Sequence, residues 1–149
     1  MDTEQIRQFA EESIGIIKYA GVKLLELESG RVVMQVPLEP QNVNHFNTMY
    51  AGVQFILAEV MGGALMMATF NVAEYVPVVG KYEIIFTKPA SSALTAELAL
   101  DQAQIDDINA QLETNKRAQF ETSTELIDQS GDVCAVGKAK YYLIHRDAI

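Results

Sequence analysis

The sequence has few of the residues that build metal and disulfide sites. Its single cysteine, Cys134, excludes an internal disulfide framework and any metal centre made of several cysteines. The two histidines, His45 and His145, leave little with which to bind zinc. We therefore expect no metal or redox cofactor, and a reducing, cytoplasmic setting.

Basic residues are also scarce. Eleven lysines and arginines stand against 20 aspartates and glutamates, which gives a formal net charge of −9. Phosphate backbones and anionic lipid surfaces are bound by basic faces, so we expect neither nucleic acid nor a membrane as a partner. Residues 1–20 carry four acidic side chains where a secretory signal needs a basic start and an unbroken apolar stretch, so no signal is expected there.

One long hydrophobic run is present, over residues 49–70, and Gln54 and Glu59 are its only strongly polar side chains. That length would just cross a bilayer. A carboxylate near the middle is costly in lipid, and the pattern that follows is typical of strands. We therefore interpret the run as a buried helix.

The length of 149 residues, with 49% hydrophobic and 21% charged residues, indicates one globular domain over 1–149. Apolar spacing predicts a helix over 3–19 that starts with a capping box of Asp2 and Gln5 and ends at Gly21. A second, long helix is predicted over 48–70, capped by Asn47 or Thr48. The remaining predictions are a polar loop over 39–47, a short helix over 101–114 and strands over 22–28, 31–37, 75–87, 94–101, 117–127 and 133–144.

The long helix is apolar almost all round, so most of its surface must be buried. The last strand supports this, because one of its faces consists mainly of small residues that would let a helix lie close: Val133, Ala135, Gly137, Ala139 and Tyr141. Cys134, Val136, Lys138 and Lys140 are expected on the outer face. The pattern predicts an α+β fold in which a curved antiparallel sheet wraps around one central helix.

The run from Asn44 to Glu59 sharpens this prediction, because it resembles hotdog-fold acyl-CoA thioesterases of the phenylacetyl-CoA type. Those proteins carry an Asn, then Gly-Thr, a hydrophobic residue, His-Gly-Gly and an acidic residue. Tyr50 replaces the family's His, and Ala51 replaces its first Gly. The variant is closest to a thioesterase subgroup that also occurs fused to acetyltransferases. Four positions match: Asn44, Thr48, Gly52 and Glu59.

Glu59 is the sharpest candidate for chemistry. Burial in an apolar helix raises the pKa of a carboxyl group, and such a group can activate water as a general base or attack directly. The alternative is a buried glutamate with a structural role only.

The start of the long helix is the second candidate. Free backbone N–H groups and the helix dipole there can stabilise an oxyanion, and the resemblance assigns this role to Ala51, with Gly52 beside it. Small residues needed only for packing are the alternative. The resemblance also implies that Asn44 orients water or the carbonyl, although it could be a turn residue, and that Tyr50, beside Thr48, narrows the pocket.

Other residues leave alternatives open. His45 precedes Glu59 by fourteen residues, as in hotdog dehydratases of 3-hydroxyacyl substrates, but the proline-rich loop of those enzymes is missing. Lys81 and Lys88 are candidates for the phosphates of coenzyme A. The hydroxyl residue that the family places at the start of the strand after the helix is absent from residues 77–81.

The resemblance therefore implies hydrolysis of an acyl thioester, with coenzyme A as part of the substrate. It also implies a homodimer, or a homotetramer built as a dimer of dimers. The sites would lie between subunits, with Glu59 and Asn44 of one site supplied by different chains. Two alternatives are a 3-hydroxyacyl dehydratase or hydratase, and a non-catalytic module that binds acyl-CoA.

Overall fold

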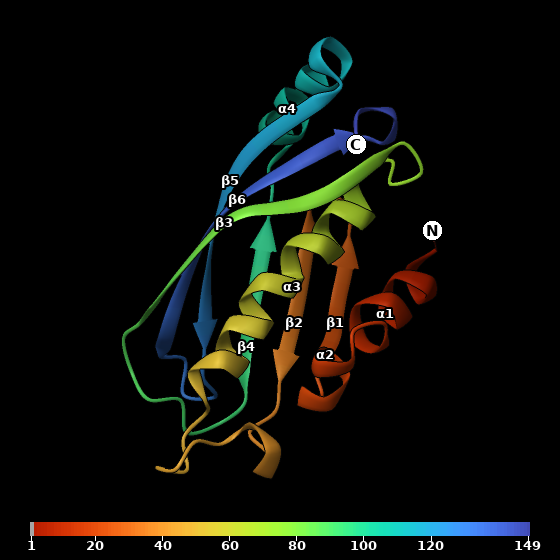
Figure 1. Cartoon of the computed structure of the whole chain (residues 1–149). Helices are drawn as coiled ribbons and strands as arrows, with labels where there is room; N and C mark the ends of the chain where they lie inside the picture. The colour runs from red at the N-terminus through yellow and green to blue at the C-terminus, as the bar shows by residue number, and fades with distance from the viewer. Residues whose placement is uncertain (1) are drawn as a thin grey trace.

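The computed structural model describes residues 2–149, which form one six-stranded antiparallel sheet and four α-helices (Figure 1). The strand order is β1-β2-β4-β5-β6-β3, so β1 and β3 lie at the edges. The strands are β1 (Lys23–Glu28), β2 (Arg31–Val36), β3 (Tyr75–Phe86), β4 (Leu94–Ala99), β5 (Arg117–Ile127) and β6 (Val133–His145). The helices are α1 (Thr3–Glu12), α2 (Gly15–Ala20), α3 (Ala51–Thr69) and α4 (Gln102–Asn115), with short 3-10 turns at Pro40–Asn42 and Arg146–Ala148.

Helix α3 lies along the inner face of the sheet, and α1 and α2 lie beside it at the β1 edge (Figure 1). Helix α3 is apolar and long enough to cross a membrane, yet half of its most hydrophobic stretch is buried against the rest of the described residues. The predicted inner face of β6 is confirmed, since Ala135, Ala139 and Tyr141 are buried. A curved antiparallel sheet around one long helix is the hotdog architecture that the sequence predicts.

Two adjacent glycines of α3 have opposite surroundings. A Cβ added at Gly62 would lie 2.1 Å from the ring of Tyr141, whereas a Cβ at Gly63 would meet nothing within 4 Å. The Tyr141 hydroxyl donates a hydrogen bond of 3.3 Å to the Glu59 carbonyl, which fixes the ring against the helix. Gly62 therefore permits the close approach of α3 to β6, and Gly63 does not take part in it.

Alanine substitutions at these two positions should change stability in opposite directions. Gly62→Ala should lower the free energy of unfolding by about 1–3 kcal/mol, because the core is overpacked. Gly63→Ala should raise it by about 0.5–1 kcal/mol, because alanine is the better helix former and the space is open. Urea denaturation of the two variants beside the wild type measures both changes, and an equal loss at the two positions would contradict this packing.

The single N-terminal helix predicted over 3–19 is wrong, because the chain forms two helices there. Ile14 is extended, with φ −110° and ψ 116°, and separates α1 from α2. In the last turn of α1, the Glu11 carboxylate accepts hydrogen bonds from the Leu24 backbone N–H and the Lys23 ammonium. The change of direction lets Ile17 enter the core. The predicted capping box of Asp2 and Gln5 is confirmed, and so is the left-handed Gly21 at the end of α2.

The predicted start of the long helix at Thr48 is also wrong. Helix α3 begins at Ala51, and neither Asn47 nor Thr48 caps it; Tyr50 occupies the N-cap position without a side-chain hydrogen bond. The preceding residues form a tight loop instead, in which Asn47 has a left-handed φ of 61° and the Thr48 carbonyl accepts a hydrogen bond from the Asn44 N–H. This loop holds the polar groups that the sequence suggested for a cap.

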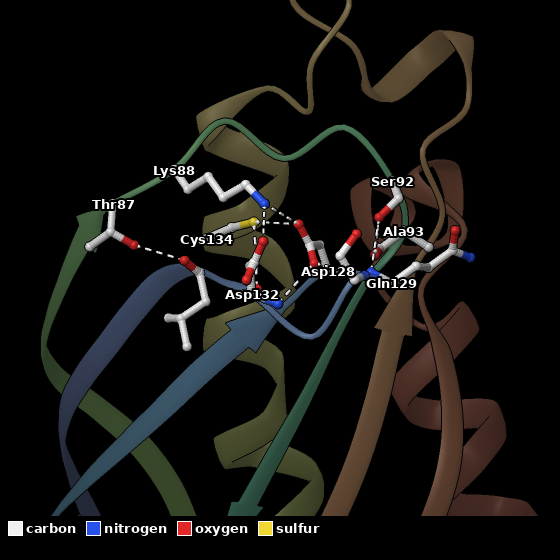
Figure 2. A network of polar contacts seen from close by, with 10 residues as sticks. Thr87, Lys88, Ser92, Ala93, Asp128, Gln129, Asp132 and Cys134 are labelled. Atoms are coloured by element: carbon white, nitrogen blue, oxygen red, sulfur yellow. Dashed lines mark hydrogen bonds and ion pairs between the residues drawn. The ribbon is translucent and has the colours of Figure 1, made fainter.

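Alternation predicted Cys134 on the outer face of the sheet, and this is wrong: the residue lies inside the protein. Its side chain is fully buried, because the segment that follows β3 crosses over it and the Thr87 and Lys88 N–H groups donate to its carbonyl. The thiol lies 3.7 Å from Asp128 (Figure 2). Burial raises the pKa of the thiol, which makes it a structural residue.

Candidate active site

A pocket of about 420 Å³ opens beside the first turn of α3 and brings together several of the predicted site residues. We call it the helix-start pocket. Four of the predicted residues line it: Asn44, Thr48, Ala51 and Lys88. The remaining walls come from the loop before α3, from α3 itself, and from the end of β3 with the segment that follows it: Phe46, Met49, Gln54, Phe86, Thr87 and Pro89.

The backbone N–H groups of Ala51 and Gly52 are free at this end of the helix. The Tyr50 carbonyl accepts hydrogen bonds from the next two N–H groups, those of Val53 and Gln54. Within residues 2–149, the N–H groups of Ala51 and Gly52 have no partner. Two unsatisfied donors therefore lie at the positive end of a 19-residue helix, at the two residues for which the sequence analysis predicts an oxyanion site.

Asn44 shapes the loop around this pocket. Its side-chain oxygen accepts hydrogen bonds from the backbone N–H groups of Phe46 and Thr48, at 2.9 and 3.2 Å, and its amide nitrogen donates to the Thr48 hydroxyl at 3.0 Å. These contacts are those of a turn asparagine, which was the alternative interpretation of the sequence. Asn44 therefore positions the pocket wall, and its side chain still lines the cavity.

Gln54 is a pocket residue to which the sequence analysis assigned no role. It is buried, its amide nitrogen donates to the Met49 carbonyl at 3.2 Å, and its side-chain oxygen has no hydrogen-bond partner within the described chain. A buried acceptor without a partner is costly unless a ligand or water satisfies it. The available signal was a polar side chain in an otherwise apolar helix.

Lys88 lines the pocket but is bound by two carboxylates (Figure 2). Its ammonium forms ion pairs with Asp128, at 3.0 Å, and with Asp132. Lys88 lowers the pKa of Asp128, and that carboxylate also accepts hydrogen bonds from the backbone N–H groups of Ser130 and Asp132. This network ties the segment that carries Lys88 to the β5–β6 turn and so fixes one wall of the pocket.

Three predicted residues lie elsewhere. His45 is exposed and contacts Phe46, with tilted rings whose centroids are 4.1 Å apart. Tyr50 is 58% exposed, and its ring lies over Gly52, where a Cβ would approach it to 2.5 Å. Lys81 lines a separate polar hollow on the outer face of the sheet, together with Lys138 and Lys140. The structure therefore does not bring Lys81 and Lys88 together.

Glu59 lies on the exposed stripe of α3, half-buried and bordering a small apolar hollow next to α1. Its carboxylate makes no hydrogen bond or ion pair with residues 2–149, and burial alone raises its pKa. The hydroxyls of Tyr82 and Tyr141 are close enough that the Glu59 charge raises their pKa values further, beyond the larger effect of burial. The predicted burial and raised pKa of Glu59 are therefore present, and its role as a general base stays a prediction.

Within one chain, however, Glu59 and the free N–H groups are separated. Ala51 and Glu59 are eight residues apart on one helix, which corresponds to about 12 Å along its axis. A single thioester carbonyl cannot contact both groups of the same helix. Among residues 2–149, no cluster of three or more His, Cys, Asp or Glu side chains could bind a metal ion.

Comparison with known proteins places this chain in a family. Residues 4–143 match the family described as a domain of unknown function, DUF4442. The chain belongs to the DUF4442 family. No curated protein matches the sequence. The DUF4442 fold is nevertheless well represented among solved structures.

One similar structure is PA5026 from Pseudomonas aeruginosa, described as a protein of unknown function and probable thioesterase. It is 32% identical, the alignment covers 98% of this chain and 97% of that one, and the TM-score is 0.92. Thioesterase HI1161 from Haemophilus influenzae is 14% identical over 97% and 92% of the two chains, with a TM-score of 0.76. The PaaI protein of E. coli, from the phenylacetic acid degradation operon, is 16% identical over 95% and 92%, with a TM-score of 0.71. These likenesses confirm the predicted hotdog fold and the resemblance to thioesterases of that fold.

Proposed function

We propose that this DUF4442 protein hydrolyses acyl thioesters, with acyl-CoA as the substrate class. The observation that carries the proposal is the presence on one helix of two free N–H groups, at Ala51 and Gly52, and of an unpaired, half-buried carboxylate at Glu59. The N–H groups would stabilise the oxyanion that forms when water adds to the thioester carbonyl. Glu59 would take the proton from that water and give it to the departing sulfur, so that coenzyme A leaves as the thiol when the carbon–sulfur bond breaks.

Two chains are needed to bring these groups together. Ala51 and Glu59 are each four residues from Phe55, which is 37% exposed and packs edge-on against Tyr82 of β3. If two copies of α3 lie antiparallel about a two-fold axis near Phe55, Ala51 of one chain faces Glu59 of the partner subunit. We therefore propose a homodimer with two shared sites.

The β3 edge supports this assembly. Strand β3 is twelve residues long, lies at an open edge of the sheet and exposes four apolar side chains: Val78, Val79, Ile85 and Phe86. A long apolar edge strand pairs readily with another strand, and a second β3 would cover it. The same pairing would bring the α3 helices of the two chains side by side.

Val79→Lys should therefore disrupt the dimer, because a charge on this edge opposes strand pairing. We expect the wild type to sediment as a dimer or dimer of dimers at micromolar concentration, and the variant to shift towards monomer and lose activity. The control is Glu113→Lys, which also introduces a lysine but lies on the exposed face of α4, away from the β3 edge. A wild type that sediments as a monomer would contradict the shared site.

The direct test of the proposed function is thiol release from a panel of acyl-CoA substrates of different length, aryl ones included. Turnover of at least one substrate is the expected result. Tight binding of acyl-CoA without turnover would favour a non-catalytic binding module. The dehydratase alternative requires His45, and the structure places that side chain outside the pocket and exposed. Phosphate contacts by Lys81 and Lys88 stay predictions.

A further inference from the structure

An apolar groove runs along α3 from Glu59 towards the end of the helix. Two adjoining hollows form it, and Phe9, Gly63 and Met67 line both. The smaller, of about 100 Å³, borders Glu59 and the helices α1 and α2. The larger, of about 610 Å³, continues to Phe70. We call the two together the α1–α3 groove.

The larger hollow is also lined by the residues before β3, by the start of β3 and by the C-terminal turn. Val72, Ala73, Val76 and Pro77 line it there, together with Arg146. The Arg146 guanidinium donates hydrogen bonds to the carbonyls of Ala73, at 3.0 Å, and Val72, at 2.9 Å. These contacts hold the Arg146 side chain in place where it lines the larger hollow.

Gly63 forms the floor of the groove halfway between the hollows. It lies four residues after Glu59 on the exposed stripe of α3, and a Cβ added there would meet nothing within 4 Å. Neighbouring Gly62 is required by Tyr141, but no contact of this kind requires a glycine at 63. The open space above Gly63 joins the Glu59 end of the groove to its larger part.

We propose that the α1–α3 groove binds the acyl chain of the substrate and that Gly63 keeps open the passage through which long chains reach the larger hollow. This inference rests on the proposed function, since it places the thioester carbonyl beside Glu59. The eleven residues from Glu59 to Phe70 span about 16 Å. An extended chain covers about 3.5 Å in three single bonds, so the groove accepts a straight acyl chain of about ten to fourteen carbons.

A straight aliphatic chain fits this groove better than an aromatic acyl group. The smaller hollow next to Glu59 holds only about 100 Å³, and the passage to the larger hollow lies over the glycine floor. The flexible Met67 side chain lines both parts and can adjust to a chain. Burial of each methylene group improves binding by about fourfold. The value of kcat/KM should therefore rise steadily with acyl length until the chain is as long as the groove.

Gly63→Leu tests the proposal, because the new side chain fills the passage about 6 Å beyond Glu59 without displacing core residues. The measurement is kcat/KM for butyryl-CoA and decanoyl-CoA. We expect the wild type to prefer decanoyl-CoA and the variant to lose that preference by at least about thirtyfold, with butyryl-CoA changed little. Gly15→Leu is the matched control, since Gly15 is also a helical glycine with open space and lies outside the groove.

A second variant covers the case in which Gly63→Leu does not fold. Met67→Ala widens the groove and removes apolar contacts with the acyl chain in both hollows, so it should lower kcat/KM for decanoyl-CoA more than for butyryl-CoA. If both folded variants keep the wild-type length profile while the wild type hydrolyses acyl-CoA, the inference fails and the proposed function stands.

Failure of the proposed function has a different signature. If no acyl-CoA is hydrolysed, the groove is tested by calorimetry, which measures the affinity of the wild type and of Gly63→Leu for decanoyl-CoA and butyryl-CoA. Tighter binding of decanoyl-CoA by the wild type, lost in Gly63→Leu, would support the groove without catalysis. Equal binding of the two probes would overturn it.

Discussion

Replacing Glu59 by glutamine is expected to lower kcat for thioester hydrolysis by about a hundredfold or more while the protein stays folded. Glutamine keeps the size of the side chain and removes the group that accepts a proton from water. No hydrogen bond or ion pair within residues 2–149 depends on the carboxylate, so its loss should leave the structure intact. Glu113→Gln, on the exposed face of α4, is the matched control and should behave as the wild type.

The same substitution should increase stability at alkaline pH. Burial raises the pKa of Glu59 above that of an unfolded glutamate, so the folded state binds the proton more tightly. Stability is therefore highest below the unfolded pKa and falls as pH rises through the folded pKa, where the buried group becomes charged. The difference in Tm between Glu59→Gln and the wild type should be near zero at low pH and should grow in favour of the variant at pH 8.

Activity depends on the same ionisation with the opposite sign. A general base must be deprotonated, so kcat should fall as pH decreases through the raised pKa of Glu59. The acid limb of the pH–rate profile is expected above 4.5, the ordinary value for a glutamate. Unchanged turnover in Glu59→Gln, or a variant that is less stable at pH 8, would mean that the carboxylate has a structural role.

Replacing Ala51 by valine is expected to lower kcat/KM by about a hundredfold to a thousandfold. Loss of one oxyanion donor costs about 3–4 kcal/mol in serine proteases, and a branched side chain would crowd the carbonyl away from the Ala51 and Gly52 N–H groups. Ala51 is exposed at the first position of α3, so the substitution should not disturb the core. Circular dichroism checks that the variant is folded.

Ala51→Gly is the matched control, because it keeps the N–H group and removes only a methyl group. It should retain most of the activity. Tyr50→His, which restores the residue of the resembling thioesterases, should also be tolerated. If folded Ala51→Val hydrolyses acyl-CoA at the wild-type rate, the carbonyl does not bind at the start of α3.

Much of the fold could be predicted because its signals are local and agree with one another. Alternation predicted the strands within one or two residues at most ends, and the all-round apolar character of α3 required a sheet around it. The errors arose where tertiary contacts override local preference. Glu11 binds the edge of β1 and breaks the first helix, and the loop before α3 uses the polar groups expected for its cap.

The site was predictable in its parts but not in its arrangement. The sequence identified Ala51, Gly52 and Glu59, and the structure shows free N–H groups and an unpaired carboxylate at those positions. It could not show that Lys88 is neutralised by Asp128, because the two residues are 40 positions apart and meet only when the sheet forms. Gln54 and the α1–α3 groove likewise depend on contacts between distant elements.

The central claim is a hydrolytic site shared between two chains, and subunit complementation tests it most directly. Glu59→Gln and Ala51→Val are each expected to be inactive. In a mixed dimer, one site combines the intact Ala51 of the first chain with the intact Glu59 of the second, and the other site carries both substitutions. After the two variants are unfolded together and refolded in equal amounts, half of the dimers are mixed.

The account predicts that this mixture regains about a quarter of the wild-type thioesterase activity, whereas each variant refolded alone stays inactive. Differently tagged chains, purified in succession, isolate the mixed dimer, which should have about half of the wild-type activity. The contradicting result is an isolated, folded mixed dimer that is as inactive as its two parents. It would show that the sites are not formed by Ala51 of one chain and Glu59 of the other.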